Sequence, residues 1–256
     1  MLHIHFHPRQ ELSMFKRGKV YAVLSSVFKV FKKKPEIINL NEEIANQAIF
    51  VSNHSAASGP FTLSIYFPKL FRPWGIYHMC FGYRQRWTYL FYTFYQQKLG
   101  YKKFKSFILA SLLGLVSGLA YRSMQVIPSY EDGRLVSTVK TSINHLKNDY
   151  SVLVFPEDSS KGYHEILTHY YPGFVLLAEQ FNQKNQTDIP VYSVYYNKKE
   201  NAFIIDKPCF LKRLLQEGHS REDIARIFRD RANELHTILH EKIEALRVSR
   251  KKGNVL

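Results

Sequence analysis

Apolar residues recur at three- and four-residue steps near the start of the chain, a spacing that places them on one face of a helix. The members of this stripe are Val20, Val23, Leu24, Val27 and Phe31. Lysines bracket the stripe at both ends, and Pro35 stops the helix. The uncharged part is shorter than the about 20 residues that cross a bilayer. The pattern predicts a basic amphipathic membrane-surface helix over residues 14–35, with docking on the protein core as the alternative.

A second helical segment is the almost uncharged run from Ser106 to Tyr121. Within it, Ala110, Gly114 and Gly118 lie four residues apart, which lets another helix approach closely. The run is also shorter than the about 20 residues that a crossing requires. We therefore expect a helix that is buried or half-embedded in a membrane.

Short β-rich runs alternate with helical patterns in the rest of the chain. The expected strands are residues 48–52, 151–155, 190–196 and 202–206. The expected helices are residues 135–146, residues 173–181 and a last helix that Ser220 and Asp223 open as a capping box. Strands that alternate with helices favour an α/β fold.

The chain shows no internal repeat and no Pro- or Ser-rich linker, so one globular domain is the simplest organisation. We expect a disordered extension over residues 1–13, the amphipathic helix over 14–35 and the domain over 36–256. Met14 directly precedes the basic segment, which makes it a candidate for the natural translation start.

The net charge of the chain indicates the class of partner that it binds. The 36 Lys and Arg residues outnumber the 21 Asp and Glu residues, and a formal charge of +15 indicates an anionic partner. Because lysines bracket the apolar stripe, we expect membrane lipids and not nucleic acid, at the cytoplasmic face of the membrane. Cys80 and Cys209 lack a metal-ligand spacing, so neither a disulfide nor a metal site is expected. The oligomeric state is left open.

Polar turns follow two of the expected strands. Asn53, His54 and Ser58 come after the first, and imidazole is the side chain best matched to general-base work near neutral pH. The second turn can orient a hydroxyl or hold a phosphate through Glu157, Asp158, Ser159, Ser160 and Lys161. A hydrogen-bonded structural histidine and a capped turn are the alternative interpretations.

Together the two turns resemble the 1-acylglycerol-3-phosphate acyltransferase family. Asn53 and His54 match its Asn-His motif, and Phe155-Pro156-Glu157 matches its Phe-Pro-Glu motif, with Ser159 in the threonine place. Softer matches are Tyr171-Pro172-Gly173 and Ile189-Pro190-Val191, in the same order along the chain. The resemblance covers a whole domain.

The resemblance implies an αβ domain with a central mixed sheet flanked by helices. It also implies transfer of a fatty acyl group from acyl-CoA or acyl carrier protein to a hydroxyl of a lysophospholipid or glycerolipid-like acceptor. His54 is then the general base, and no cofactor is needed beyond the acyl donor. The substrate-binding residues would be Asn53, Ser58, Arg134, Ser159, Ser160 and Lys161.

The sequence departs from the family at three places. Gly59 stands where the family has an aspartate that orients the histidine, and in serine proteases losing such a carboxylate costs about 10⁴ in rate. We expect Glu157 or Asp158 to supply the missing group.

No arginine ends the second-motif strand near Val126 to Tyr130, although Arg122 and Arg134 flank it. Asp158 and Ser160 replace the third-motif glycine and arginine. An acceptor other than glycerol 3-phosphate is expected, and a non-catalytic relative that binds lipid or a protein partner is the alternative.

A segment rich in aromatic residues and arginine runs from Pro68 to Tyr101. Amphipathic rings of this kind suit the membrane interface, while core aromatics with solvated charges are the alternative.

Overall fold

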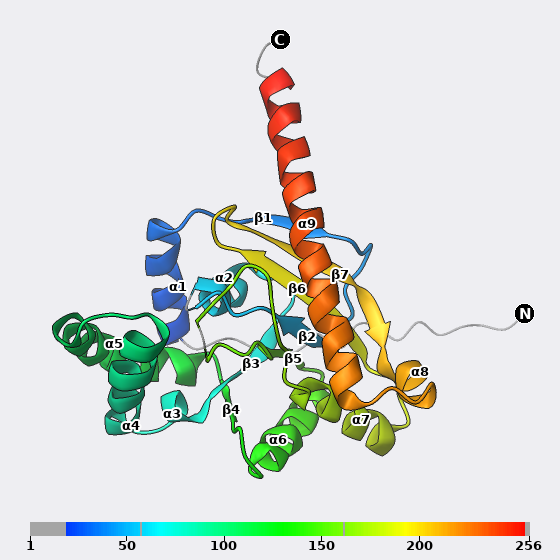
Figure 1. The fold of residues 1–256 in the computed structure, drawn as a ribbon, viewed down its shortest axis with the longest axis horizontal. Coiled ribbons are helices and arrows are strands. Elements are labelled where there is room, and N and C mark those ends of the chain that lie inside the picture. Colours follow the sequence, from blue (N-terminus) through cyan, green and yellow to red (C-terminus); the bar gives the residue numbers. More distant parts are fainter. Residues whose placement is uncertain (1–18, 57, 161, 254–256) are drawn as a thin grey trace, which may run out of the picture.

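A mixed sheet forms the centre of the molecule in the computed structural model, which describes residues 19–56, 58–160 and 162–253 (Figure 1). The expected extension over residues 1–13 and the beginning of the expected helix, residues 14–18, lie outside the described residues. The described strands are β1 (Glu36–Asn39), β2 (Ile49–Ser52), β3 (Phe71–Ile76), β4 (Ile127–Ser129), β5 (Ser151–Val154), β6 (Pro190–Asn197) and β7 (Ala202–Phe210). They lie in the order β1-β7-β6-β2-β5-β3-β4, and every neighbouring pair is parallel except β6 and β7. The expected α/β class with a central mixed sheet is confirmed.

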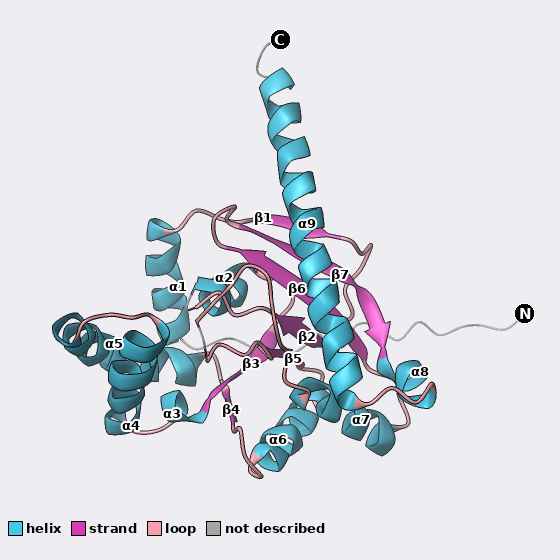
Figure 2. Cartoon of the chain, viewed as in Figure 1, coloured by secondary structure: helices cyan, strands magenta, loops and turns pink. Residues whose placement is uncertain are grey.

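Helices surround this sheet (Figure 2). They are α1 (Lys19–Phe31), α2 (Ser58–Tyr66), α3 (Tyr77–Cys80), α4 (Tyr83–Thr88), the π-helix η1 (Tyr89–Lys98), α5 (Lys103–Ser123), α6 (Leu135–Lys147), α7 (Gly173–Asn185), α8 (Leu211–Gln216) and α9 (Arg221–Gly253). The four expected strands and the helices expected at α5, α6, α7 and α9 are confirmed. The capping box is also present, because the Ser220 amide donates to the Asp223 carboxylate and the Asp223 amide donates to the Ser220 hydroxyl.

Alternate residues of the central strands point to opposite faces of the sheet, and both faces are buried. On one face, Ile49 and Val51 belong to the core that α6, α7 and α9 cover. On the other face, Phe50 packs in a second core with Leu63 of α2. The central strands are therefore almost continuously apolar, which is why they were recognisable in the sequence.

Residues 68–101 fold into β3, α3, α4 and η1, where the sequence indicated only an aromatic segment. Here Leu90 and Tyr95 are buried in a third apolar cluster with Ala110 of α5, whereas Tyr92 is exposed. The close helix approach expected at the small residues of α5 is confirmed. A Cβ atom on Gly118 would lie 2.6 Å from the Arg86 guanidinium of α4. This helical group lies beside the sheet, at the left of Figure 1.

One side of α1 is docked on α2. The ring of Phe28 stacks on that of Phe61, with 5.8 Å between centroids, and Tyr66 donates a hydrogen bond to the carbonyl of Lys32. Lys32 itself donates to the hydroxyls of Ser58 and Tyr196, each at 2.7 Å. The opposite side of the helix exposes Val23, Val27 and Val30. Docking on the protein thus accounts for one face, and anchoring of the other face in a membrane stays a prediction.

Candidate active site

The polar turns after β2 and β5 lie side by side, as expected from two parallel neighbouring strands whose carboxyl ends share one edge of the sheet. The direct link is a hydrogen bond of 2.7 Å from the backbone N–H of His54 to Oε2 of Glu157. Two motifs that are about a hundred residues apart in the sequence are thereby joined.

The turn that carries His54 is fixed from the side of β6. Asn53 is buried, its Nδ2 donates to the Tyr196 carbonyl at 2.9 Å, and its Oδ1 accepts from the Tyr196 amide at 2.8 Å. Ser55 and Ala56 follow with φ angles of 46° and 53°. The left-handed conformation costs roughly 1–2 kcal/mol for each such residue, and strain of this kind concentrates at functional sites. Asn53, expected to bind substrate, instead uses its side chain to hold the backbone.

Gly59 occupies a place where a side chain does not fit. A Cβ atom there would lie 2.3 Å from the carbonyl oxygen of His54, well inside van der Waals contact. Helix α2 therefore begins against the backbone of the histidine itself. The aspartate that the resembled family has at this place is incompatible with this close approach, which gives a physical reason for the glycine.

The imidazole of His54 lies between two aromatic rings. Tyr163 stacks on it with 5.2 Å between ring centroids, and Phe155 meets it edge-on at 5.1 Å. Burial, together with the positive charge of Lys98, lowers the pKa of His54 from 6.5 to about 4. The ring is neutral at physiological pH and able to accept a proton, although it is a weaker base than one tuned to neutrality.

The expected hydrogen bond between a carboxylate and the imidazole is not formed in this arrangement. Nδ1 of His54 finds no hydrogen-bond partner within the part of the chain that the structure describes. Glu157 holds the backbone of the histidine in place of its ring, and burial raises the pKa of Glu157. Asp158 accepts from the Ser160 amide at 2.9 Å, which lowers the pKa of Asp158. The structure thus differs from the sequence-based hypothesis, because packing between rings orients His54.

A cation that sequence reasoning missed stands beside the histidine. Lys98, the last residue of η1, donates from Nζ to the Ser159 hydroxyl at 2.7 Å. Burial lowers the pKa of Lys98, while the charges of Glu131, Asp158 and Glu157 favour its protonated form. Ser159 therefore lies in the site as expected. Lys161, the cation expected from the motif, lies outside the described residues.

The remaining residues expected to bind substrate lie elsewhere. Arg134 forms a two-pronged ion pair with Asp132 and lies over the rings of Tyr77 and Tyr130, at 4.7 and 4.4 Å from their centroids. It does not line the cavity that reaches His54. Ser58 is hydrogen-bonded to Lys32 and Tyr196, and Ser160 is exposed. The structure brings together His54, Glu157 and Ser159, and adds Lys98.

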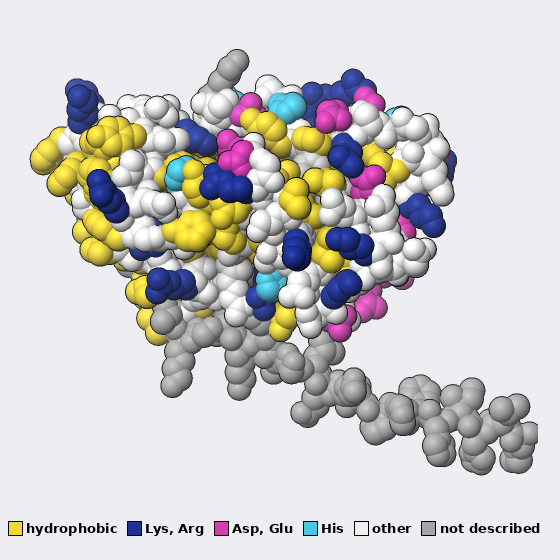
Figure 3. Space-filling model, turned by 90° about the horizontal axis from the view of Figure 1, so that it is seen from below, with side chains coloured by type: hydrophobic (Ala, Val, Ile, Leu, Met, Phe, Trp, Pro, Cys, Tyr) yellow, Lys and Arg dark blue, Asp and Glu magenta, His cyan; other side chains and the backbone are white. Residues whose placement is uncertain are grey.

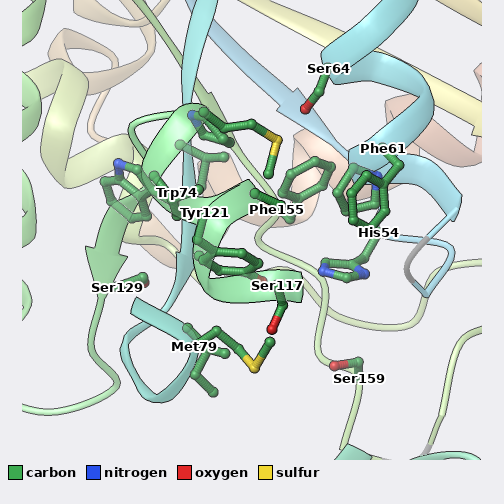
Figure 4. A pocket seen from close by; sticks show the side chains of 18 of the residues that line it. His54, Phe61, Ser64, Trp74, Met79, Ser117, Tyr121, Ser129, Phe155 and Ser159 are labelled. Atoms are coloured by element: carbon green, nitrogen blue, oxygen red, sulfur yellow. The ribbon is translucent and has the colours of Figure 1, made fainter. Parts of the chain in front are cut away.

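A cavity of about 820 Å³ leads to this group, within the range of roughly 300–1,000 Å³ usual for ligand sites. Figure 4 shows the ring of His54 pointing into it beside Phe155. The polar residues of the lining include His54, Lys98, Glu131, Glu157, Ser159 and Tyr163. The apolar lining comes from several elements and includes Leu24, Phe61, Met79, Leu90, Leu113 and Val116. The shape and chemistry suit a long apolar chain with a polar reacting end.

Other chemistries find less support in the site. Within the described residues, no group of three or more His, Cys, Asp or Glu side chains is arranged to hold a metal ion. Burial raises the pKa of the Cys80 thiol to about 12, so this cysteine is not a thiolate nucleophile at neutral pH. His54 remains the candidate for proton transfer.

Comparison with solved structures shows a similarity of fold. The chain is similar to the crystal structure of the 1-acyl-sn-glycerophosphate (LPA) acyltransferase PlsC from Thermotoga maritima, with a TM-score of 0.47 and 13% sequence identity. The similarity covers 87% of this chain and 84% of that chain. Neither a protein-family model nor a curated protein sequence matches the chain.

Proposed function

We propose that the protein is an O-acyltransferase that moves a fatty acyl group from acyl-CoA or acyl carrier protein to a hydroxyl of a lysophospholipid or glycerolipid-like acceptor. The observation that carries this proposal is the neutral imidazole of His54 at the polar end of a large, mostly apolar cavity. A fatty acyl thioester fits such a cavity, because its long apolar chain ends in one reactive polar group. The protein would work at the cytoplasmic face of the membrane, as a peripheral or monotopic protein.

In the reaction, His54 removes the proton of the acceptor hydroxyl while the oxygen attacks the thioester carbonyl. The tetrahedral intermediate then collapses, the C–S bond breaks, and the thiolate leaves with the proton that the imidazolium returns. Lys98 lies close enough to His54 to depress its pKa, so its ammonium group is suited to stabilise an oxyanion next to the ring. Glu157 keeps the turn of His54 in place through the backbone.

The acceptor is proposed to differ from glycerol 3-phosphate. The arginine expected near β4 is absent, and Arg134 is neutralised by Asp132 outside the cavity. At the polar end, the carboxyl groups of Glu131 and Glu157 accompany the single positive charge of Lys98 among the described lining residues. A doubly charged phosphate monoester is a poor match for a polar end with one cation beside two carboxyl groups.

A second candidate is a relative that binds a lipid without turning it over. It is favoured by the lack of a carboxylate on the imidazole of His54, since Glu157 binds the backbone instead and a base without such a partner loses much of its efficiency. In that case the same cavity would hold an acyl chain, and His54 would be a packed aromatic residue.

The experiment is an acyl-transfer assay with long-chain acyl-CoA and acyl carrier protein, offered with a panel of lysophospholipids and other lipid hydroxyls. Product lipid is measured by mass spectrometry and thiol release by absorbance. Wild type is compared with His54→Ala and with His219→Ala, an exposed histidine remote in sequence from the site. Acceptor-dependent transfer that only His54→Ala abolishes supports the enzyme. Absence of transfer from folded protein that still binds acyl chains supports the non-catalytic relative.

A further inference from the structure

The cavity has an apolar mouth between two helices. Three aliphatic residues that line it are also strongly exposed, Val27 of α1 at 53%, Leu113 at 44% and Val116 at 47%, both of α5. A residue that both lines a cavity and faces solvent marks the place where the cavity reaches the surface. Glu131 and Tyr171 also line the cavity and are exposed, so the cavity reaches the surface a second time among polar groups.

The surface around this mouth is unusually apolar. The large apolar side chains that α5 exposes are Phe104, Phe107, Ile108, Leu112, Leu115 and Leu119, in addition to the two at the mouth. No acidic residue occurs in Lys103–Ser123. Figure 3 shows apolar side chains gathered at the side of the molecule where α5 lies. Monomeric soluble proteins rarely expose contiguous apolar patches of this kind.

Basic residues flank the apolar face. Lys102, Lys103 and Lys105 are exposed at the amino end of α5 and Arg122 at its carboxyl end. Lys29 and Lys33 are exposed on α1 and just beyond it. Lysine and arginine at the border of an apolar face match anionic lipid headgroups, each contributing roughly 1 kcal/mol near a charged surface. The complementary partner is an anionic bilayer.

Helix α5 is held against the domain in a way that favours lying on the membrane over crossing it. By length and composition it is the one described helix that could span a bilayer. However, Gly114 and Gly118 are buried against α4, and the buried Arg86 donates from Nε to the Gly114 carbonyl at 3.1 Å. A crossing α5 would carry this arginine and α4 into hydrocarbon, at a high cost in free energy.

We propose that the exposed face of α5, together with Val23, Val27 and Val30 of α1, enters one leaflet of an anionic bilayer, and that the lipid acyl chain reaches His54 through the mouth between these helices. The chain then passes from hydrocarbon into the apolar cavity without crossing water, which removes the main barrier to extracting a lipid. The route for the acyl chain rests on the proposed function, whereas docking on the bilayer does not.

The docking test is sedimentation of the full chain with vesicles of phosphatidylcholine, with and without phosphatidylglycerol. Leu115→Asp places a charge on the α5 face, and Val136→Asp on α6 is a matched control, since the two residues are 63% and 62% exposed and neither lines the cavity. Wild type and Val136→Asp bind the anionic vesicles, and Leu115→Asp binds about tenfold or more weakly. Equal binding of the two variants, with unchanged thermal unfolding, overturns the proposal.

Two further arms separate the alternatives. A concentration-dependent dimer that Leu115→Asp dissociates, without vesicle binding by wild type, identifies a second copy as the occupant and overturns the bilayer. His54→Ala keeps vesicle binding even if no reaction is found, so failure of the proposed function leaves the docking result intact.

For the acyl route, Val116→Trp narrows the mouth and lowers transfer of long-chain more than short-chain acyl groups. An equal effect on both chain lengths overturns the route.

Discussion

Glu157 holds His54 by its backbone: Oε2 accepts the N–H of the histidine at 2.7 Å, and the imidazole is left to the rings of Tyr163 and Phe155. A carboxylate that binds the main chain fixes where the residue is, and the flanking rings fix which way the side chain points. The division of roles differs from a triad, in which one carboxylate bonds the imidazole directly. Position and orientation can therefore be tested by separate substitutions.

Glu157→Gln keeps the size of the side chain and removes its charge. Hydrogen bonds to charged groups contribute about 1.5–3 kcal/mol, so we expect the free energy of unfolding to fall by a part of that amount. Displacement of the His54 turn lowers transfer by about tenfold to a hundredfold. Chemical denaturation and the transfer assay measure the two effects. Glu241→Gln, on the exposed side of α9, serves as control, and equal behaviour of the two variants contradicts the assigned role.

Gly59→Ala tests the close approach of α2 to the histidine. The added methyl group would lie 2.3 Å from the His54 carbonyl oxygen, so the turn must move. Overpacking of this kind costs about 1–3 kcal/mol, and transfer activity falls with it. Gly133→Ala meets no atom within 4 Å and is the matched control. Gly59→Asp, which restores the family's carboxylate in sequence, is expected to be worse than alanine. Gain of activity in that variant would show that the turn can accept the side chain.

The low pKa of His54 makes folding sensitive to acid. In the unfolded chain the imidazole titrates near 6.5, and in the folded protein burial depresses its pKa to about 4. The unfolded state therefore binds the proton first as the pH falls, and stability is lost between these two values. From pH 7 to pH 5 the loss from this residue is on the order of 1–2 kcal/mol. Denaturant titrations of wild type and His54→Gln measure it, since other histidines contribute equally to both. Parallel pH dependences would mean that the ring is not shielded.

Lys98→Met removes the ammonium group from the site. Without that positive charge the pKa of His54 rises, yet it stays below 6.5 because burial is the larger cause. Transfer falls by about tenfold or more as oxyanion stabilisation is lost, and Lys98→Arg, which keeps the charge, retains part of the activity. NMR titration of His54 gives the pKa, and Lys140→Met on exposed α6 is the control. An unchanged His54 pKa in Lys98→Met would place the lysine outside the site.

The sequence was sufficient for the parts of the site that depend on neighbouring strands. Both polar turns follow apolar runs, and parallel pairing of β2 with β5 brought His54 and Glu157 together as predicted. It was insufficient for Lys98, because the position of that residue depends on how residues 68–101 fold, and their mixture of aromatic and basic residues has no clear period. Arg134 had the right charge near the right strand, but its local pairing with Asp132 could not be read from spacing.

The same limit applies to Gly59 and to α1. A glycine in a motif place looks like a lost function until the distance to the His54 carbonyl shows that no side chain fits. The stripe on α1 was correctly predicted as helical, but Lys32, one of the lysines that bracket it, points inward to Tyr196 and Ser58. Periodicity predicts a face, and only the tertiary structure shows what covers it.

Because η1 is a π-helix, the number of residues in it determines whether Lys98 points toward Ser159. The Leu99 amide donates to the Phe94 carbonyl five residues earlier, one residue more than in an α-helix. Each residue of an α-helix turns the chain by about 100°, so a shorter η1 in ordinary α-helical register would turn the lysine away from Ser159. Among related sequences, a deletion of one residue between Tyr89 and Lys98 would thus mark the members that have given up this ammonium group, even where the lysine itself is retained.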